Sequence, residues 1–181
     1  DFTLNILNIK TNMKKFVIVF TMLVLSTTMF AQKSAIQSAF NYQKNGKLDK
    51  AKEYIDKSVE HEKTIADPKA WYYRGNIYID IYNSPLEAYR ELDPDALGVA
   101  YKSYQKAITL DEKKTYTDEI IEKMPGLGEL FFNEGARQYN AGIEAQNNTD
   151  TLAAQKSFGM SVEAFEQAYN IYTQAGINDT T

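Results

Sequence analysis

The side chains of this chain that could take part in chemistry are mostly carboxylates and tyrosines. Its 181 residues include a single histidine, His61, and no cysteine. Disulfides, thiolate catalysis and metal sites built from cysteines or histidine pairs are therefore excluded. The carboxylates at Asp93, Asp95, Asp118 and Glu119 lie at expected helix starts, where they suit the positive end of the helix dipole. We therefore expect no active site, no metal and no cofactor.

The charge of the chain argues against a nucleic-acid partner. The chain has 20 basic and 24 acidic residues. The first 31 positions hold three of the basic and one of the acidic residues, so the remaining positions carry a net charge of −6. Binding to nucleic acid needs a basic face that neutralises phosphates. The sequence also lacks the glycine-rich loops that cradle nucleotide phosphates. We expect a protein that is not an enzyme and binds no nucleic acid.

Residues 13–31 have the layout of a secretory signal peptide. Two lysines follow Met13, and a mostly apolar run then extends from Phe16 to Phe30. This order of a positive start and an apolar stretch is typical of export signals. An uncleaved anchor is the alternative, but the run is shorter than the roughly 20 residues of a membrane span.

We expect cleavage between Ala31 and Gln32 and a location in the periplasm of a Gram-negative bacterium or outside the cell. Residues 1–12 precede a good initiator methionine, and we interpret them as an artefact of the gene start. No stable membrane anchor would remain on residues 32–181 after cleavage.

Apolar residues recur at helical spacing from residue 34 onward, and no segment alternates as a strand would. Turn signals at Asn45-Gly46, Asp67-Pro68 and Asp93-Pro94 divide the chain. The spacing predicts an all-α protein with helices over residues 34–44, 48–62, 69–82, 94–110, 117–124, 127–146 and 151–174.

Aromatic and small residues recur within these helices. Small residues let two helix backbones approach, and an aromatic ring fills the space beside them. Trp71, Gly75 and Tyr78 match a second set 61 residues later. We expect the residues that pack the helices together to be Ala39, Tyr42, Ala51, Trp71, Gly75, Tyr78, Ala100, Tyr104, Ala107, Phe132, Ala136, Tyr139, Phe165 and Ala168.

The pattern of Trp71, Gly75 and Tyr78, followed by a small–aromatic–small set around Tyr104, resembles the tetratricopeptide repeat. The resemblance implies antiparallel helix pairs stacked as a short right-handed solenoid. Its repeats are lengthened relative to the family's period of about 34 residues. Pro85 favours a loop in the second unit, and the third unit is expected to have long helices. The units cover residues 34–67, 68–111 and 126–175.

Such a fold implies a non-enzymatic scaffold of the cell envelope that binds a protein or peptide partner in its groove. We expect Tyr72, Arg74, Asn76 and Tyr82 to line that groove. Two other functions stay open: an N-terminal assembly module of a longer envelope protein, because no polar capping helix is visible, and a glycan-binding accessory protein that uses exposed tyrosines. The oligomeric state is not predicted.

Overall fold

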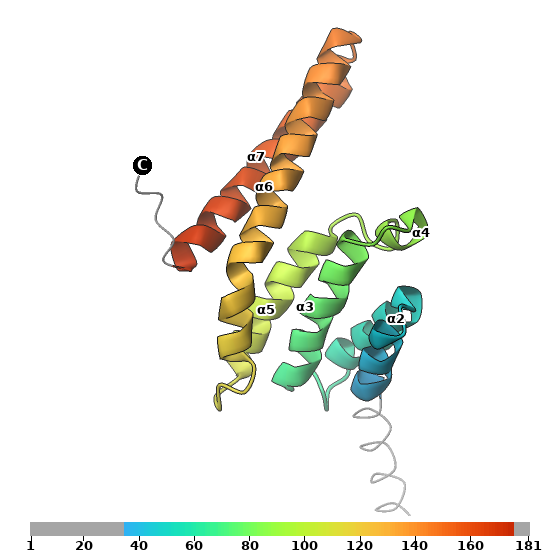
Figure 1. Ribbon diagram of the computed structural model, residues 1–181, viewed down its shortest axis with the longest axis vertical. Coiled ribbons are helices and arrows are strands. Elements are labelled where there is room, and N and C mark those ends of the chain that lie inside the picture. Colours follow the sequence, from blue (N-terminus) through green and yellow to red (C-terminus); the bar gives the residue numbers. More distant parts are fainter. Residues whose placement is uncertain (1–34, 176–181) are drawn as a thin grey trace, which may run out of the picture.

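The computed structural model describes residues 35–175, in which every regular element is a helix (Figure 1). The expected all-α class is thus confirmed. The expected signal peptide and its cleavage site at Ala31 and Gln32 lie outside the described residues. No described helix is long and apolar enough to cross a membrane. A first helix covers residues 35–44, and α2 (Leu48–Glu60), α3 (Pro68–Tyr82), α4 (Glu87–Arg90), α5 (Ala96–Leu110), α6 (Thr117–Asn147) and α7 (Thr151–Gln174) follow.

Local capping sets several of these boundaries. Gly46 adopts a φ of 68°, a left-handed conformation that ends the first helix and that glycine reaches without strain. The Asp67 carboxylate accepts a hydrogen bond from the backbone N–H of Lys69, and Pro68 occupies the first position of α3. Asp150 caps α7 in the same way. Each of these breaks is readable in the sequence.

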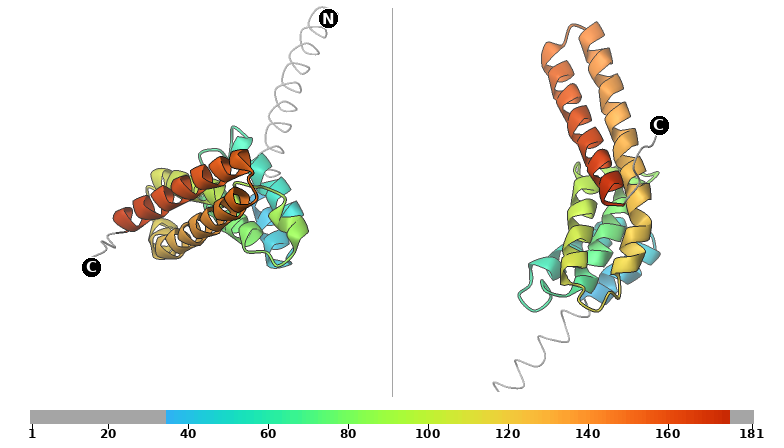
Figure 2. Two further views of the ribbon diagram at one scale, coloured as in Figure 1. Left: turned by 90° about the horizontal axis from the view of Figure 1, so that it is seen from above. Right: turned by 90° about the vertical axis from the view of Figure 1, so that its left-hand side faces the viewer.

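The helices pack as pairs of neighbours in sequence. Residues 35–44 and α2 share one core cluster with α3, and α5 pairs with α3 (Figure 1). The long helices α6 and α7 form an antiparallel hairpin whose far end projects beyond the other helices (Figure 2). The insertion of the second unit is a loop with the short helix α4, whereas that of the third unit lengthens both helices.

Pro125 lies inside α6, so the expected break between a helix over 117–124 and another over 127–146 is wrong. A proline in a helix interior costs about 3 kcal/mol. Four apolar side chains on both sides of it share one buried stripe, and burying each stabilises the fold by about 1.5–3 kcal/mol. The free energy gained by burying these side chains therefore exceeds the cost of the proline. These side chains are Ile120, Met124, Leu127 and Phe131.

Glycines on α6 meet aromatic rings on α7 at a spacing of seven residues on both helices. A Cβ atom added at Gly128, Gly135 or Gly142 would lie 2.9, 2.8 or 2.6 Å from a ring atom of the opposing residue. Side chains larger than hydrogen do not fit there without displacing the ring, so glycine allows the close approach of the two helices. The opposing rings are Tyr172, Phe165 and Phe158, respectively.

This register differs by one residue from the expected one. Gly135, and not Ala136, faces Phe165. Phe132 and Tyr139, which we expected between the helices, are about half exposed. The reason is that the seven-residue spacing of the glycines sets the contact line of α6, and Phe132 and Tyr139 lie beside that line. In the first two units, by contrast, the expected packing residues lie in the core or against it: Ala39, Tyr42, Ala51, Trp71, Gly75, Tyr78, Ala100, Tyr104 and Ala107.

Replacing Gly75 by alanine should destabilise the fold. The new Cβ would overlap the ring of Tyr104, which is fully buried and would have to shift. Overpacking of this kind costs about 1–3 kcal/mol, more than the roughly 1 kcal/mol that alanine gains in helix propensity. Chemical denaturation should show a lower free energy of unfolding for Gly75→Ala.

Gly126→Ala is the matched control, because a Cβ there has no neighbour within 4 Å. It should stabilise the protein by about 0.5–1 kcal/mol through helix propensity alone. A Gly75→Ala variant as stable as Gly126→Ala would contradict the close packing of α3 on α5.

Candidate functional site

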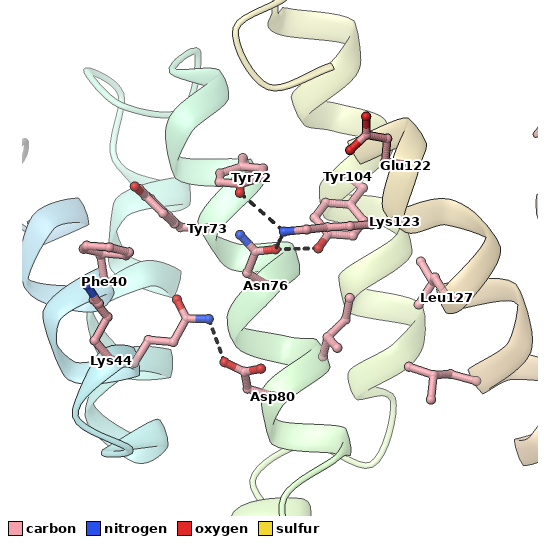
Figure 3. A pocket seen from close by; sticks show the side chains of 14 residues that line it. Phe40, Lys44, Tyr72, Tyr73, Asn76, Asp80, Tyr104, Glu122, Lys123 and Leu127 are labelled. Carbon is pink, nitrogen blue, oxygen red and sulfur yellow. Dashed lines mark hydrogen bonds between the residues drawn. The ribbon is translucent and has the colours of Figure 1, made fainter. Parts of the chain in front are cut away.

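An open groove runs between the first described helix, α3 and α6, with Tyr104 of α5 beneath it (Figure 3). Its volume is about 770 Å³. Three segments far apart in the sequence build it, so its shape depends on how the helix pairs stack. It is lined by Phe40, Gln43, Lys44, Tyr72, Tyr73, Asn76, Ile79, Asp80, Tyr104, Glu122, Lys123, Gly126, Leu127 and Leu130.

Asn76 is the polar centre of this groove. Its Oδ1 atom accepts a hydrogen bond of 2.6 Å from the hydroxyl of Tyr104 and one of 2.9 Å from Nζ of Lys123 (Figure 3). Both bonds use the oxygen, so the amide nitrogen is left to donate to a ligand. Burial raises the pKa of Tyr104, which keeps its hydroxyl protonated as a donor.

Lys123 is held as a cation at the α6 side of the groove. Nζ lies 2.9 Å from Oε1 of Glu119 and 5.1 Å from the centre of the Tyr72 ring. Its burial lowers the pKa, but the hydrogen bonds and charge of Glu119 and Tyr72 outweigh burial and raise the pKa overall. The Tyr72 hydroxyl donates to Glu119, and this bond, followed by that of Lys123, lowers the pKa of Glu119. Glu119 and Lys123 are therefore both charged at neutral pH.

The side of the groove opposite α6 carries aromatic rings and a second lysine, Lys44. The rings of Phe40 and Tyr73 lie 4.9 Å apart, and Nζ of Lys44 lies 5.3 Å from the Phe40 ring. Gln43 donates a hydrogen bond of 2.7 Å to Asp80 and thereby joins the first helix to α3. The groove thus offers the ammonium group of Lys44, an amide donor and partly exposed rings, whereas the ammonium group of Lys123 is already paired with Glu119 (Figure 3).

Two of the four residues expected in the groove line it, Tyr72 and Asn76. Arg74 lies on the other side of α3, two residues or about 200° around the helix from Tyr72. There its Nε lies 2.9 Å from Asp56 and its Nη1 donates to Ser103, so it links α2, α3 and α5. Tyr82 donates to Glu134 of α6, and its burial raises its pKa to about 12.

The sequence reasoning missed Lys44 and Lys123. Lys123 was assigned to a short separate helix that ends at Pro125, outside the third unit. The apolar spacing that continues across Pro125 would have placed it on the first helix of that unit. Lys44 lies in the expected first helix, but nothing in the spacing distinguishes it from other exposed lysines.

Among the described residues, no group of three or more histidine, aspartate or glutamate side chains could hold a metal ion. His61 follows the last residue of α2, where its ring nitrogen accepts a hydrogen bond from the backbone of Lys63. The lining of the groove allows recognition by charge, hydrogen bonds and aromatic contact.

Asp111 positions the start of α6 and with it Lys123. Its carboxylate accepts hydrogen bonds from the backbone N–H groups of Thr115, Tyr116 and Thr117 and from the Thr117 hydroxyl. Desolvation alone would raise the pKa of Asp111, but these hydrogen bonds outweigh it and lower the pKa below its usual 3.8. The charged form therefore stabilises the fold.

Asp111→Asn should lower the melting temperature at pH 7, because an amide cannot accept these bonds as a carboxylate does. A lowered pKa contributes stability that is complete above the usual value and is lost as pH falls through the folded-state pKa. The difference between wild type and variant should therefore be constant from pH 7 to 5 and narrow below pH 3.8. A difference that stays constant down to pH 2 would argue against the charged cap.

In comparisons with protein-family models, curated proteins and solved structures, nothing matches this chain. A function for it is therefore inferred from its side chains and their geometry.

Proposed function

We propose that this protein is a non-enzymatic binding scaffold whose groove takes an extended peptide segment of a partner protein. The observation that carries the proposal is the groove itself. It brings hydrogen-bond donors and partly exposed rings from three separate helices to one open surface. Peptides are recognised by such combinations of pockets and placed polar groups.

The arrangement of helices supports a tetratricopeptide-like solenoid as part of this proposal. The groove is lined by residues 35–44, α3 and α6, which are the first helices of the three pairs. The second helices α2 and α7 contribute no residue to it, and α5 contributes only Tyr104. A regular division of this kind is what stacked helix pairs produce.

The groove chemistry favours a ligand with a carboxylate next to an apolar side chain. Lys44 and Lys123 stand on opposite walls, and the Asn76 amide lies between them (Figure 3). A carboxylate would accept from Lys44 and from the Asn76 amide, while its apolar neighbour packs on Phe40 and Tyr73. Asp80 and Glu122 also line the groove, and they would disfavour ligands with several negative charges.

The proposed place of action is the cell envelope, as a periplasmic or secreted protein. This part rests on the export signal in residues 13–31, and detection of the protein in the periplasmic fraction would test it. An N-terminal module of a longer envelope protein would use the same groove. A glycan-binding accessory protein would use the aromatic side of the groove at Phe40 and Tyr73. The peptide selection described below distinguishes glycan binding from peptide binding.

Selection of a displayed library of random peptides on the purified protein should enrich sequences with an acidic residue or a free C-terminus beside an apolar residue. Fluorescence anisotropy then measures the affinity of an enriched peptide. Lys44→Glu should weaken it at least about tenfold, or 1.4 kcal/mol, because a carboxylate replaces the ammonium group.

Lys106→Glu, the same change of charge on an exposed residue of α5 outside the groove, should leave the affinity unchanged. Equal losses in both variants would indicate attraction by overall charge and contradict a groove site. Failure to enrich any peptide, together with binding to a glycan array, would favour the accessory protein.

A further inference from the structure

The hairpin of α6 and α7 carries an apolar face that is separate from the groove. Four residues of α6 and four of α7 repeat at intervals of four, three and four, which places each set on one side of its helix. Ring contacts at 5.3 Å between Phe132 and Phe165 and at 5.7 Å between Tyr139 and Phe158 join the two sets. We call this surface the hairpin face; it consists of Phe132, Ala136, Tyr139, Ile143, Phe158, Val162, Phe165 and Tyr169.

The hairpin face points away from the other described helices. Glu134 accepts a hydrogen bond of 3.0 Å from Tyr82 of α3, so its side of α6 faces the rest of the fold. Phe132 precedes Glu134 by two residues and therefore lies about 200° around the helix, on the opposite side. The hairpin also projects beyond α3 and α5 (Figure 2). Within residues 35–175 nothing covers the hairpin face.

The exposed area of this face matches what a dimer needs. The exposed fractions are 52% for Phe132, 51% for Tyr139, 38% for Ile143, 56% for Val162 and 71% for Tyr169. With aromatic side chains of about 150–250 Å² each, the exposed apolar area is on the order of 500 Å². A standard interface buries about 800 Å² per partner, of which about 60% is apolar. This is as large as the largest apolar patch on a typical monomer, about 300–600 Å², and such patches often have a function.

We propose that the hairpin faces of two copies of this chain pack together and form a four-helix bundle. In this dimer the twofold axis lies in the interface and runs perpendicular to the helices, so the tip of one hairpin lies over the base of the other. Phe132 of one copy then faces Tyr139 of the other, and the axis passes near Ala136. Two antiparallel hairpins joined through one apolar seam are the usual architecture of a four-helix bundle.

The sizes of the side chains suit this arrangement. Tyr169, the most exposed residue of the face, lies over the region of Gly159 and Val162 in the second copy. A Cβ atom at Gly159 would have no neighbour within 4 Å, so there is space above α7 at this point. Large residues opposite small ones allow two surfaces to interdigitate. The groove lies elsewhere on the fold, so this inference does not depend on the proposed function.

Sedimentation equilibrium of the purified protein should show a monomer–dimer equilibrium. Tyr169→Glu should raise the dissociation constant at least about tenfold, because it places a charge within an apolar interface. Ile65→Glu is the control, since Ile65 is also an exposed apolar residue (44%) but lies in the loop between α2 and α3. Circular dichroism should show unchanged helix content in both variants.

The absence of cysteine from the chain permits a direct test of the arrangement. Ala136→Cys should form an intermolecular disulfide on mild oxidation, because the two copies of residue 136 meet at the twofold axis. Lys106→Cys on α5 should not. A protein that stays monomeric at all concentrations, or a dimer that Tyr169→Glu leaves intact, would overturn the proposal. Dimerisation without the Ala136→Cys disulfide would overturn the antiparallel arrangement.

Discussion

The fold depends on the contact between a glycine on one helix and an aromatic ring on its neighbour. Gly75 faces Tyr104 between α3 and α5, and three glycines of α6 face three rings of α7. A helix pair can approach this closely only where one side chain is a hydrogen atom, and the ring then fills the space beside the backbone. Each contact therefore sets both the distance between two helices and their register.

The same contact couples the packing of the second pair to the groove. The Tyr104 ring packs on Gly75, and its hydroxyl donates a hydrogen bond to Asn76, the next residue of α3. The Oδ1 atom of Asn76 also accepts a hydrogen bond from Lys123 of α6. This bond in the groove positions the third helix pair against the second. A change in the Gly75 contact would move the donors that we propose for ligand binding. In the third pair the glycines set the register that leaves Phe132 and Tyr139 exposed beside the contact line.

Local signals in the sequence predicted the helices well, but they did not predict the contacts of the third pair. Caps at Asp67 and Asp150 and the turn at Gly46 act within a few residues, so composition and spacing reveal them. Pro125 is a local signal for a helix end, but the burial of apolar side chains on both sides of it keeps α6 continuous. Ala136 is as small as the residues matched to it, so only the recurrence of glycine every seven residues distinguishes the true contact line. The groove was half predicted because Tyr72 and Asn76 lie on a well-predicted helix, whereas Lys123 lies beyond the proline.

The register of α6 against α7 is the feature to test first, because the hairpin face follows from it. Nuclear Overhauser effects between glycine Hα protons and aromatic ring protons would measure it directly. We expect three cross-peaks, joining Gly128 to Tyr172, Gly135 to Phe165 and Gly142 to Phe158. Cross-peaks from Phe165 to the Ala136 methyl group in place of Gly135, with the rings of Phe132 and Tyr139 protected between the helices, would contradict it.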